Sequence, residues 1–118
     1  MENLIYYLST CDTNRKILKN LPKDKFILCD IKKLHVTESD LDKAAGFFGS
    51  YGALLNKRAQ KFKGMNENEK PKTEDEIRKT ILSDYTFLNR PLIKAGNEWF
   101  AGSQPETIEK LMDAIKKL

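Results

Sequence analysis

The chain has 118 residues, 40% of them hydrophobic, and a formal net charge of +4, which suits one soluble domain with one core. Two cysteines and one histidine are too few for a disulfide framework or for the usual zinc sites. Nothing at the N-terminus resembles a signal peptide, and no apolar run reaches the roughly 18 residues of a membrane span. The sequence therefore predicts a cytoplasmic protein with reduced thiols, no metal and no membrane association. The mild positive charge favours anionic partners.

The first third of the chain has the pattern of a strand, a helix and a second strand. Residues 4–8 and residues 26–31 are short runs of aromatic and branched side chains that predict two buried strands. Between them, apolar residues at helical spacing predict a helix that is capped by Asp12 or Thr13 and ends at Pro22. A crossover of this kind makes the two strands parallel neighbours.

The middle of the chain, about residues 37–86, predicts a helical insertion. Thr37 can cap a helix whose first turn is acidic and whose apolar residues keep helical spacing. A second, short helix is expected to begin at Leu54 and to run out through residue 64. Thr73 and Glu76 have the spacing of a capping box at the start of a third helix.

In the last third of the chain the hydrophobic pattern changes from helical spacing to short strand-like runs and then back to helical spacing. Residues 91–94 and 99–101 flank a short polar stretch and predict an antiparallel hairpin. Ser103 and Glu106 have the spacing of a second capping box, which would open an apolar-striped terminal helix. The predicted order is therefore β-α-β, helices, then β-β-α, an α/β fold.

Cys11 is the first candidate for chemistry, because it lies where a strand ends and a helix begins. The N–H groups and positive end of a helix stabilise a thiolate, which is the reactive form of cysteine. In the same turn, Thr13, Asn14 and Arg15 could cradle an oxyanion. The alternative from position alone is that Cys11 is a small buried hydrophobe.

The second cysteine, Cys29, has a different context. It lies inside an apolar strand, so the sequence predicts an inert core residue. Asn14 stands where a C-x-x-C motif would have its second cysteine, which excludes a dithiol mechanism within that motif. A redox cycle would have to take its second thiol from another molecule or from Cys29.

The chain has four arginines, whose planar forks suit bidentate contacts with oxyanions. Arg15 follows Cys11, and Arg90 precedes Pro91 directly before a predicted strand, where a cis peptide bond would turn the backbone sharply. Arg58 lies in a basic stretch that, by itself, predicts a solvated surface. Arg78 is expected to be solvated as well.

Three other features receive structural interpretations. The basic stretch of residues 57–72 is interrupted by acids and offers one aromatic side chain, which disfavours nucleic-acid binding. His35 precedes a helix cap, so a surface or capping role is expected. Trp99 and Phe100 are expected to pack in the core or the hairpin.

Taken together, three segments resemble the ArsC/Spx family, arsenate reductase-like chains with a thioredoxin fold. These are the first strand with residues 11–15, the Leu-Leu-Asn-Lys-Arg of residues 54–58, and the Leu-Asn-Arg-Pro-Leu-Ile of residues 88–93. The resemblance covers nearly the whole chain. It implies one thioredoxin-like, ArsC-like domain over residues 1–118 with a helical insertion at about residues 37–86.

The resemblance also implies roles for individual residues. Cys11 matches the family's nucleophile. Three arginines would stabilise the oxyanion and the thiol: Arg15, Arg58 and Arg90. Three further residues are expected to contribute to oxyanion or substrate binding: Thr13, Asn14 and Pro91. No metal is implied.

The sequence departs from the well-studied glutaredoxin-linked arsenate reductases at three places. Asn56 stands where those enzymes have an arginine directly after the two leucines, whereas Arg58 matches the Spx-like and uncharacterised branches. Tyr7 stands where those enzymes have a histidine, and Ala101 and Gly102 stand where they have a further arginine. Asn14 removes the C-x-x-C redox switch that many Spx-type members carry. The chain thus resembles a monothiol branch of the family.

The resemblance implies an arsenate reductase-like thiol oxidoreductase with no bound cofactor. Arsenate or a glutathione adduct would be the substrate, and glutathione with glutaredoxin would donate the electrons. Two alternatives are a Spx-like transcriptional regulator that binds RNA polymerase, and a thiol-binding module that reduces no arsenate.

Overall fold

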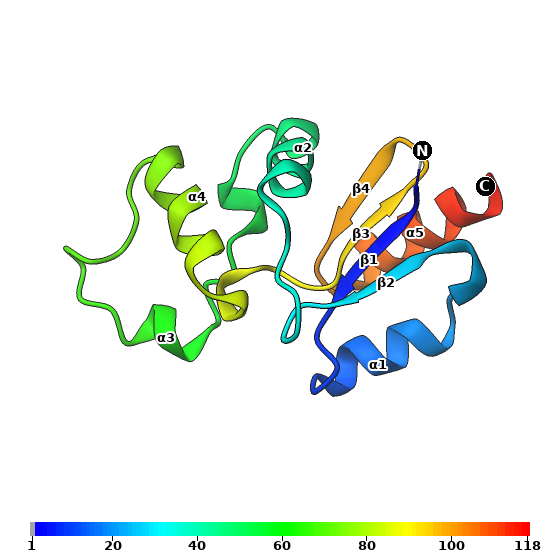
Figure 1. Ribbon diagram of the computed structural model, residues 1–118, viewed down its shortest axis with the longest axis horizontal. Coiled ribbons are helices and arrows are strands. Elements are labelled where there is room, and N and C mark those ends of the chain that lie inside the picture. The colour runs from blue at the N-terminus through cyan, green and yellow to red at the C-terminus, as the bar shows by residue number, and fades with distance from the viewer. Residues whose placement is uncertain (1) are drawn as a thin grey trace. The chain divides into compact units, whose positions relative to one another are not determined.

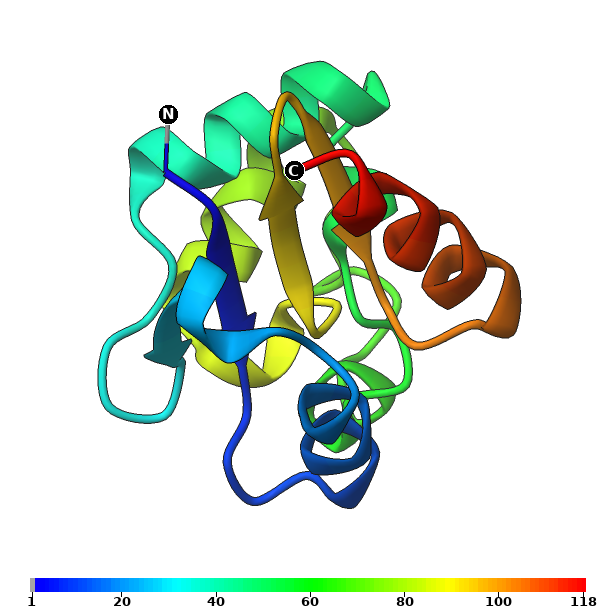
Figure 2. The same ribbon diagram turned by 90° about the vertical axis from the view of Figure 1, so that its right-hand side faces the viewer.

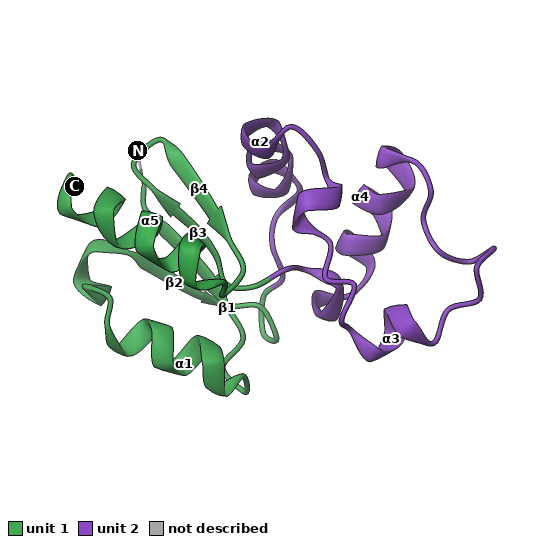
Figure 3. Cartoon of the chain, turned by 180° about the vertical axis from the view of Figure 1, so that it is seen from behind, with its two compact units in different colours: residues 1–34, 90–118 green, residues 35–89 purple. Residues whose placement is uncertain are grey.

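The computed structural model describes residues 2–118 (Figure 1). The chain divides into two compact units, one made of residues 1–34 and 90–118 and the other of residues 35–89 (Figure 3). The first unit contains the sheet and both chain ends, and the second is helical.

The first unit is built on a mixed sheet of four strands: β1 (Leu4–Tyr7), β2 (Ile27–Asp30), β3 (Leu92–Ala95) and β4 (Glu98–Ala101). Their order in the sheet is β2-β1-β3-β4. β1 pairs in parallel with β2, whereas β3 is antiparallel to both β1 and β4. This arrangement confirms the predicted α/β fold with a β-α-β start and a β-β-α end.

The strand register shows which segments of the chain meet at one end of the sheet. Tyr6 of β1 lies opposite Leu92 of β3. Because these two strands are antiparallel, the chain that enters β3 through Arg90 and Pro91 does so at the edge where β1 ends. The turn that follows β1 therefore lies at the same edge of the sheet as Arg90.

Two helices, α1 (Asp12–Lys19) and α5 (Pro105–Lys116), pack on one face of this sheet (Figure 2). Ile5, Ile93 and Phe100 are neighbours across three strands, so their side chains project from the same face. The core on this face contains Ile5, Leu18, Leu21, Phe26, Ile93, Ala95, Phe100, Leu111, Ala114 and Ile115. Burial of each large member contributes about 1.5–3 kcal/mol to the stability of the unit.

The second unit contains the predicted helical segment. Its elements are α2 (Glu38–Phe48), the 3-10 helix η2 (Gly52–Leu54), α3 (Gln60–Lys63), α4 (Glu74–Ser83) and the 3-10 helix η3 (Tyr85–Phe87). Thr37 caps α2 by accepting a hydrogen bond from the Asp40 backbone N–H. Thr73 and Glu76 form both hydrogen bonds of the predicted capping box at the start of α4.

One predicted helix is wrong. The sequence predicted a continuous helix from Leu54 to residue 64, but η2 ends at Leu54 and α3 begins only at Gln60. Between them, Leu55 pairs with Leu88 in an isolated β-bridge. Asn56 donates to the Phe87 carbonyl through its backbone and to the neighbouring Thr86 carbonyl through its side chain. These tertiary hydrogen bonds replace the helical ones in this segment.

Two predicted helix starts also differ from the structure. The residue at the N-cap of α1 is Cys11, which precedes both predicted caps, Asp12 by one residue and Thr13 by two. The N-cap of α5 is Gln104, and its side chain makes no capping hydrogen bond. Pro105 takes the first helical position, which moves the helix start away from Ser103.

Arg78 and His35 are engaged inside the second unit. The Arg78 guanidinium donates to the Asp42 carboxylate, at 2.8 Å from Nε to Oδ1, and to Glu38 at 3.3 Å. These bonds connect α4 to α2, so the prediction of a merely solvated arginine is wrong. Hydrogen bonds from Arg78 and then from Tyr51 lower the pKa of Asp42. His35 Nε2 lies 2.8 Å from the Ile81 carbonyl oxygen, which is a tertiary contact rather than a helix cap.

Candidate functional site

Cys11 is the N-cap residue of α1, at the turn that follows β1 (Figure 1). Its backbone is extended, with φ −94° and ψ 117°, and its side chain makes no capping hydrogen bond. The backbone of the turn is fixed, because the Cys11 N–H donates to the Leu8 carbonyl and the Arg15 N–H donates to the Cys11 carbonyl, both at 3.0 Å. The half-buried thiol therefore lies beside the N–H groups of the first helical turn, which favour a negative charge.

Asn14 holds this turn from the interior. Its side chain is only 1% exposed, although it is polar. Its Oδ1 accepts a hydrogen bond of 2.9 Å from the Leu8 backbone N–H. The amide side chain is thus occupied in joining the end of β1 to α1, and the part of Asn14 that remains at the helix N-terminus is its backbone N–H.

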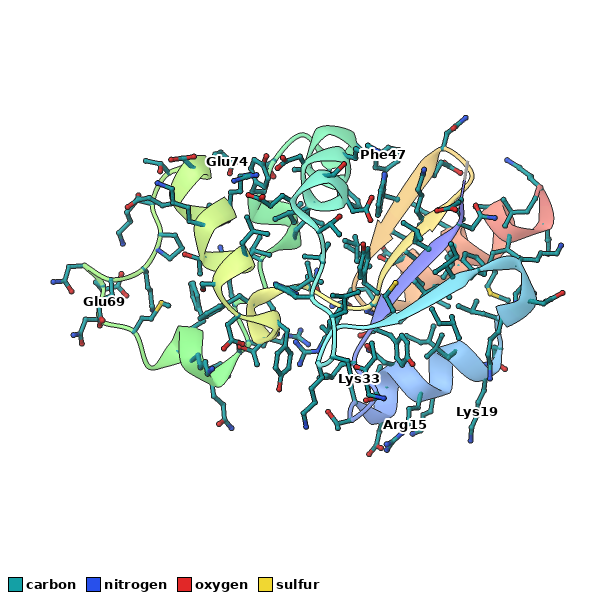
Figure 4. All side chains as sticks on the ribbon, viewed as in Figure 1. Arg15, Lys19, Lys33, Phe47, Glu69 and Glu74 are labelled. Atoms are coloured by element: carbon teal, nitrogen blue, oxygen red, sulfur yellow. The ribbon has the colours of Figure 1, made fainter. Side chains whose placement is uncertain are left out.

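Arg15 lies on the outer side of the same turn, at the start of α1 (Figure 4). Its guanidinium donates to the Asp12 carboxylate and, at 3.2 Å, to the Ser9 carbonyl. The side chains of Arg15 and Asp12 are 55% and 78% exposed, respectively. Thr13 is exposed as well. The structure thus brings Thr13 and Arg15 into the turn of Cys11, with Asp12 as the partner of the guanidinium.

Asp30 contacts this turn from the end of β2, and it was not among the residues predicted from the sequence. It is the last residue of β2, and its Oδ1 accepts from the Ser9 backbone N–H at 3.3 Å and from the Lys32 N–H at 3.2 Å. Hydrogen bonding from the Ser9 side chain is the largest cause that lowers the pKa of Asp30. A signal was available: an acid at the carboxyl end of a strand parallel to β1 lies at the same sheet edge as the turn after β1.

Arg90 and Pro91 enter β3 at the edge of the sheet that carries the Cys11 turn. The peptide bond between them is cis. Pro91 is fully buried, and its carbonyl accepts a hydrogen bond of 3.0 Å from the Gly102 N–H just after β4. Arg90 is half-buried. The strand pairing thus places Arg90 at the end of the sheet where the thiol lies.

Arg58 lies in the second unit, in a turn between η2 and α3. Its side chain is exposed, and its backbone N–H donates to Asn56 Oδ1 at 3.2 Å. Because Asn56 is itself bonded to η3, the backbone of Arg58 has a defined conformation within that unit.

Cys29 differs from its predicted place in the core. It lies opposite Tyr6, in β2, and is half-buried. β2 is one of the two edge strands of the sheet, and its first two residues, Ile27 and Leu28, are 46% and 41% exposed. An apolar run does not reveal whether a strand lies at the centre or at the edge of a sheet, so the sequence overestimated the burial of Cys29.

Two further features, a metal-binding cluster and a membrane-spanning helix, are absent from residues 2–118. Within this range, His, Cys, Asp and Glu side chains form no group of three or more that could hold a metal ion. None of the helices in the described part of the chain is long and apolar enough to cross a membrane.

Comparison with known proteins identifies the family. The sequence matches the ArsC family over residues 6–111. An arsenate reductase from Vibrio cholerae has a similar structure, with 18% identity, a TM-score of 0.71, and coverage of 93% of this chain and 97% of that one. An arsenate reductase (ArsC) related protein from Brucella melitensis has 22% identity, a TM-score of 0.67 and 95% coverage of both chains.

A third similar structure is a protein from Bacteroides fragilis described as related to the ArsC family. It has 22% identity, a TM-score of 0.77, and coverage of 94% of this chain and 98% of that one. The search of curated proteins gave no match. The solved structures show that the fold is shared, and the family match covers most of the sequence. The chain therefore belongs to the ArsC family, a thiol oxidoreductase family with a thioredoxin-like fold.

Proposed function

We propose that the protein is a monothiol oxidoreductase of the arsenate reductase type, with Cys11 as its nucleophile. The observation that carries this proposal is the position of Cys11 at the N-cap of α1, where the side chain makes no capping hydrogen bond. The N–H groups and the positive end of a helix interact favourably with a negative charge at this position. The thiolate is the form that attacks.

The proposed reaction has three steps. The Cys11 thiolate attacks the arsenic atom of arsenate, a sulfur–arsenic(V) bond forms, and an arsenic-bound oxygen leaves as water after protonation. A glutathione thiolate then attacks Cys11 Sγ. The sulfur–arsenic bond breaks, its electron pair stays on arsenic, and arsenite leaves as arsenic(III), while the two sulfurs are oxidised to a mixed disulfide. A glutaredoxin thiol attacks the glutathione sulfur and releases the Cys11 thiolate.

Arginines support the anionic steps of this reaction. Arg15 lies in the Cys11 turn, and Arg90 enters β3 at the same sheet edge. The family resemblance assigns Arg58 to the same task. Planar guanidinium groups match the oxygens of arsenate and strengthen their contacts as negative charge grows. Thr13, through its hydroxyl, and Asn14, through its backbone N–H, would complete the oxyanion contacts, and Pro91 would shape the wall beside them.

The number of thiols in the turn supports a second thiol from outside it. Asn14 occupies the place of a second cysteine and uses its side chain for a buried hydrogen bond. The Cys11 turn therefore has no internal thiol with which to resolve a mixed disulfide. The second thiol is proposed to come from glutathione, and glutaredoxin is the proposed partner that resets Cys11.

The test measures arsenate-dependent oxidation of NADPH with glutathione, glutathione reductase and glutaredoxin present. The wild type is compared with Cys11→Ser and with Cys29→Ser, which removes the other thiol. Turnover is expected in the wild type and in Cys29→Ser and is expected to be lost in Cys11→Ser. Wild-type turnover no higher than that of Cys11→Ser would refute the proposed function.

A further inference from the structure

The Cys11 turn contains a carboxylate, on the residue that follows the cysteine in the sequence. Asp12 is the first residue of α1, and its carboxylate accepts a hydrogen bond from the Arg15 guanidinium. Asp30, the other carboxylate of the turn, differs in its surroundings, because it accepts backbone N–H groups of Ser9 and Lys32. Asp12 is thus the exposed carboxylate beside Cys11 in the sequence, and its partner is the guanidinium that is proposed to bind a substrate oxyanion.

A carboxylate and an oxyanion recognise the same features of this turn. Both accept hydrogen bonds from guanidinium groups, and both are stabilised by the positive end of a helix. Asp12 already occupies the Arg15 guanidinium and adds a negative charge to the first turn of α1. An oxyanion that binds over Cys11 must therefore share the Arg15 guanidinium with this carboxylate or displace it.

We infer that Asp12 is a specificity residue, an internal competitor that lowers the affinity of the Cys11 turn for small oxyanions. The inference rests on the proposed function, since it concerns the same thiol and the same oxyanion. Its consequence is a turn whose affinity for a small dianion is lower than Arg15 and the helix N-terminus alone would give. Asp12 here acts through Arg15 and is not itself a reacting group.

The size of the effect is bounded by the exposure of the pair. An exposed ion pair typically changes an equilibrium constant by about onefold to fivefold. Removal of the Asp12 charge also removes a repulsion, which at about 4 Å in water is worth up to about fivefold and less at longer range. With each effect at about twofold to threefold, near the middle of its range, their product predicts that Asp12→Asn strengthens oxyanion binding by about threefold to tenfold.

The experiment measures oxyanion binding without requiring turnover. Iodoacetamide, which is uncharged, alkylates Cys11 in the Cys29→Ser background, and inorganic sulfate is added at constant ionic strength. Each rate is divided by the sulfate-free rate of the same variant, so that a change in thiol reactivity cancels. The sulfate concentration that halves the relative rate is expected to fall about threefold to tenfold in Asp12→Asn.

Asp24→Asn is the matched control. Asp24 is exposed in the 3-10 helix η1 (Lys23–Lys25), beyond the opposite end of α1, and the change alters the net charge by the same amount. The half-protection concentration is expected to stay within twofold of the parent value. Equal shifts in Asp12→Asn and Asp24→Asn, or absence of sulfate protection in every variant, would overturn the inference.

A second comparison tests competition for Arg15 in particular. The gain from Asp12→Asn is measured again in an Arg15→Ala background, where no guanidinium remains to be released. A smaller gain in that background supports the inference, and an equal gain overturns it. Arsenate turnover is measured separately. If the wild type shows no turnover but Asp12→Asn still binds sulfate more tightly, the proposed function fails and the role of Asp12 stands.

Discussion

The buried hydrogen bond of Asn14 gives a quantitative test of how the Cys11 turn is held. Asn14→Ala removes the acceptor of the Leu8 backbone N–H, and Leu8 is itself only 7% exposed. A buried donor left without a partner costs about 1–3 kcal/mol. The lost packing of a side chain that is 1% exposed adds to this cost. We therefore expect a loss of about 2–3 kcal/mol of unfolding free energy.

The assay is equilibrium unfolding in urea followed by circular dichroism. With a slope of about 1–3 kcal/mol per molar urea for a small protein, the midpoint should fall by about 1–2 M. Asn20→Ala is the matched control, because Asn20 is exposed at the other end of α1 and makes only a 3.4 Å side-chain hydrogen bond to the Lys16 carbonyl. It should cost less than about 0.5 kcal/mol.

The reasoning would be refuted if Asn14→Ala and Asn20→Ala had equal effects, or if Asn14→Ala cost less than about 0.5 kcal/mol with an unchanged slope. Either result would mean that the Leu8 N–H finds another partner at no cost. The Asn14 side chain would then not be what joins β1 to α1.

Two other predictions concern pH and helix capping. Burial raises the pKa of Asp84, but hydrogen bonds from Lys61 and Thr86 outweigh it and hold the pKa at about 2. The unfolded value is about 3.9, so the contribution of Asp84, about 1–2 kcal/mol, is present above about pH 4 and is lost as the pH falls toward 2. The difference in stability between wild type and Asp84→Asn should shrink over that interval in acid-titrated urea unfolding. Thr73→Ala should cost about 1 kcal/mol in the same assay at neutral pH, whereas Ser103→Ala should cost almost nothing, because only the first of these residues caps a helix.

The sheet and the longer helices could be predicted because their signals are local. The aromatic and branched runs that became β1 and β2 suit a pleated, half-buried surface, and the capping box at Thr73 is a contact between residues three apart. The position of Cys11 at a strand-to-helix junction follows from the same local patterns. The sequence therefore located the turn that carries the candidate nucleophile.

The missed features depend on contacts between distant residues. Arg78 bonds to Asp42, 36 residues earlier, and Asp30 bonds to Ser9, 21 residues earlier. Periodicity contains no information about such pairs, so the prediction from the sequence was a solvated Arg78 and gave no role to Asp30. The same limit explains the wrong prediction of a core position for Cys29, because its burial depends on the position of β2 at an edge of the sheet.

The hydrogen bonds that hold the Cys11 turn do not use the thiol, so the thiol can be replaced without loss of the bonds that hold the fold. Asn14 bonds to the Leu8 N–H, Asp30 bonds to the Ser9 N–H, and Cys11 itself contributes only backbone groups. Cys11→Ser should therefore leave the turn intact. Serine is also a better N-cap than cysteine, because its hydroxyl oxygen can accept from the N–H groups of the first turn. We expect the unfolding free energy of Cys11→Ser to equal that of the wild type or to exceed it by up to about 1 kcal/mol, so that its urea midpoint is the same or higher. A midpoint well below that of the wild type would mean that the thiol supports the fold, and loss of turnover in this variant would then no longer report chemistry alone.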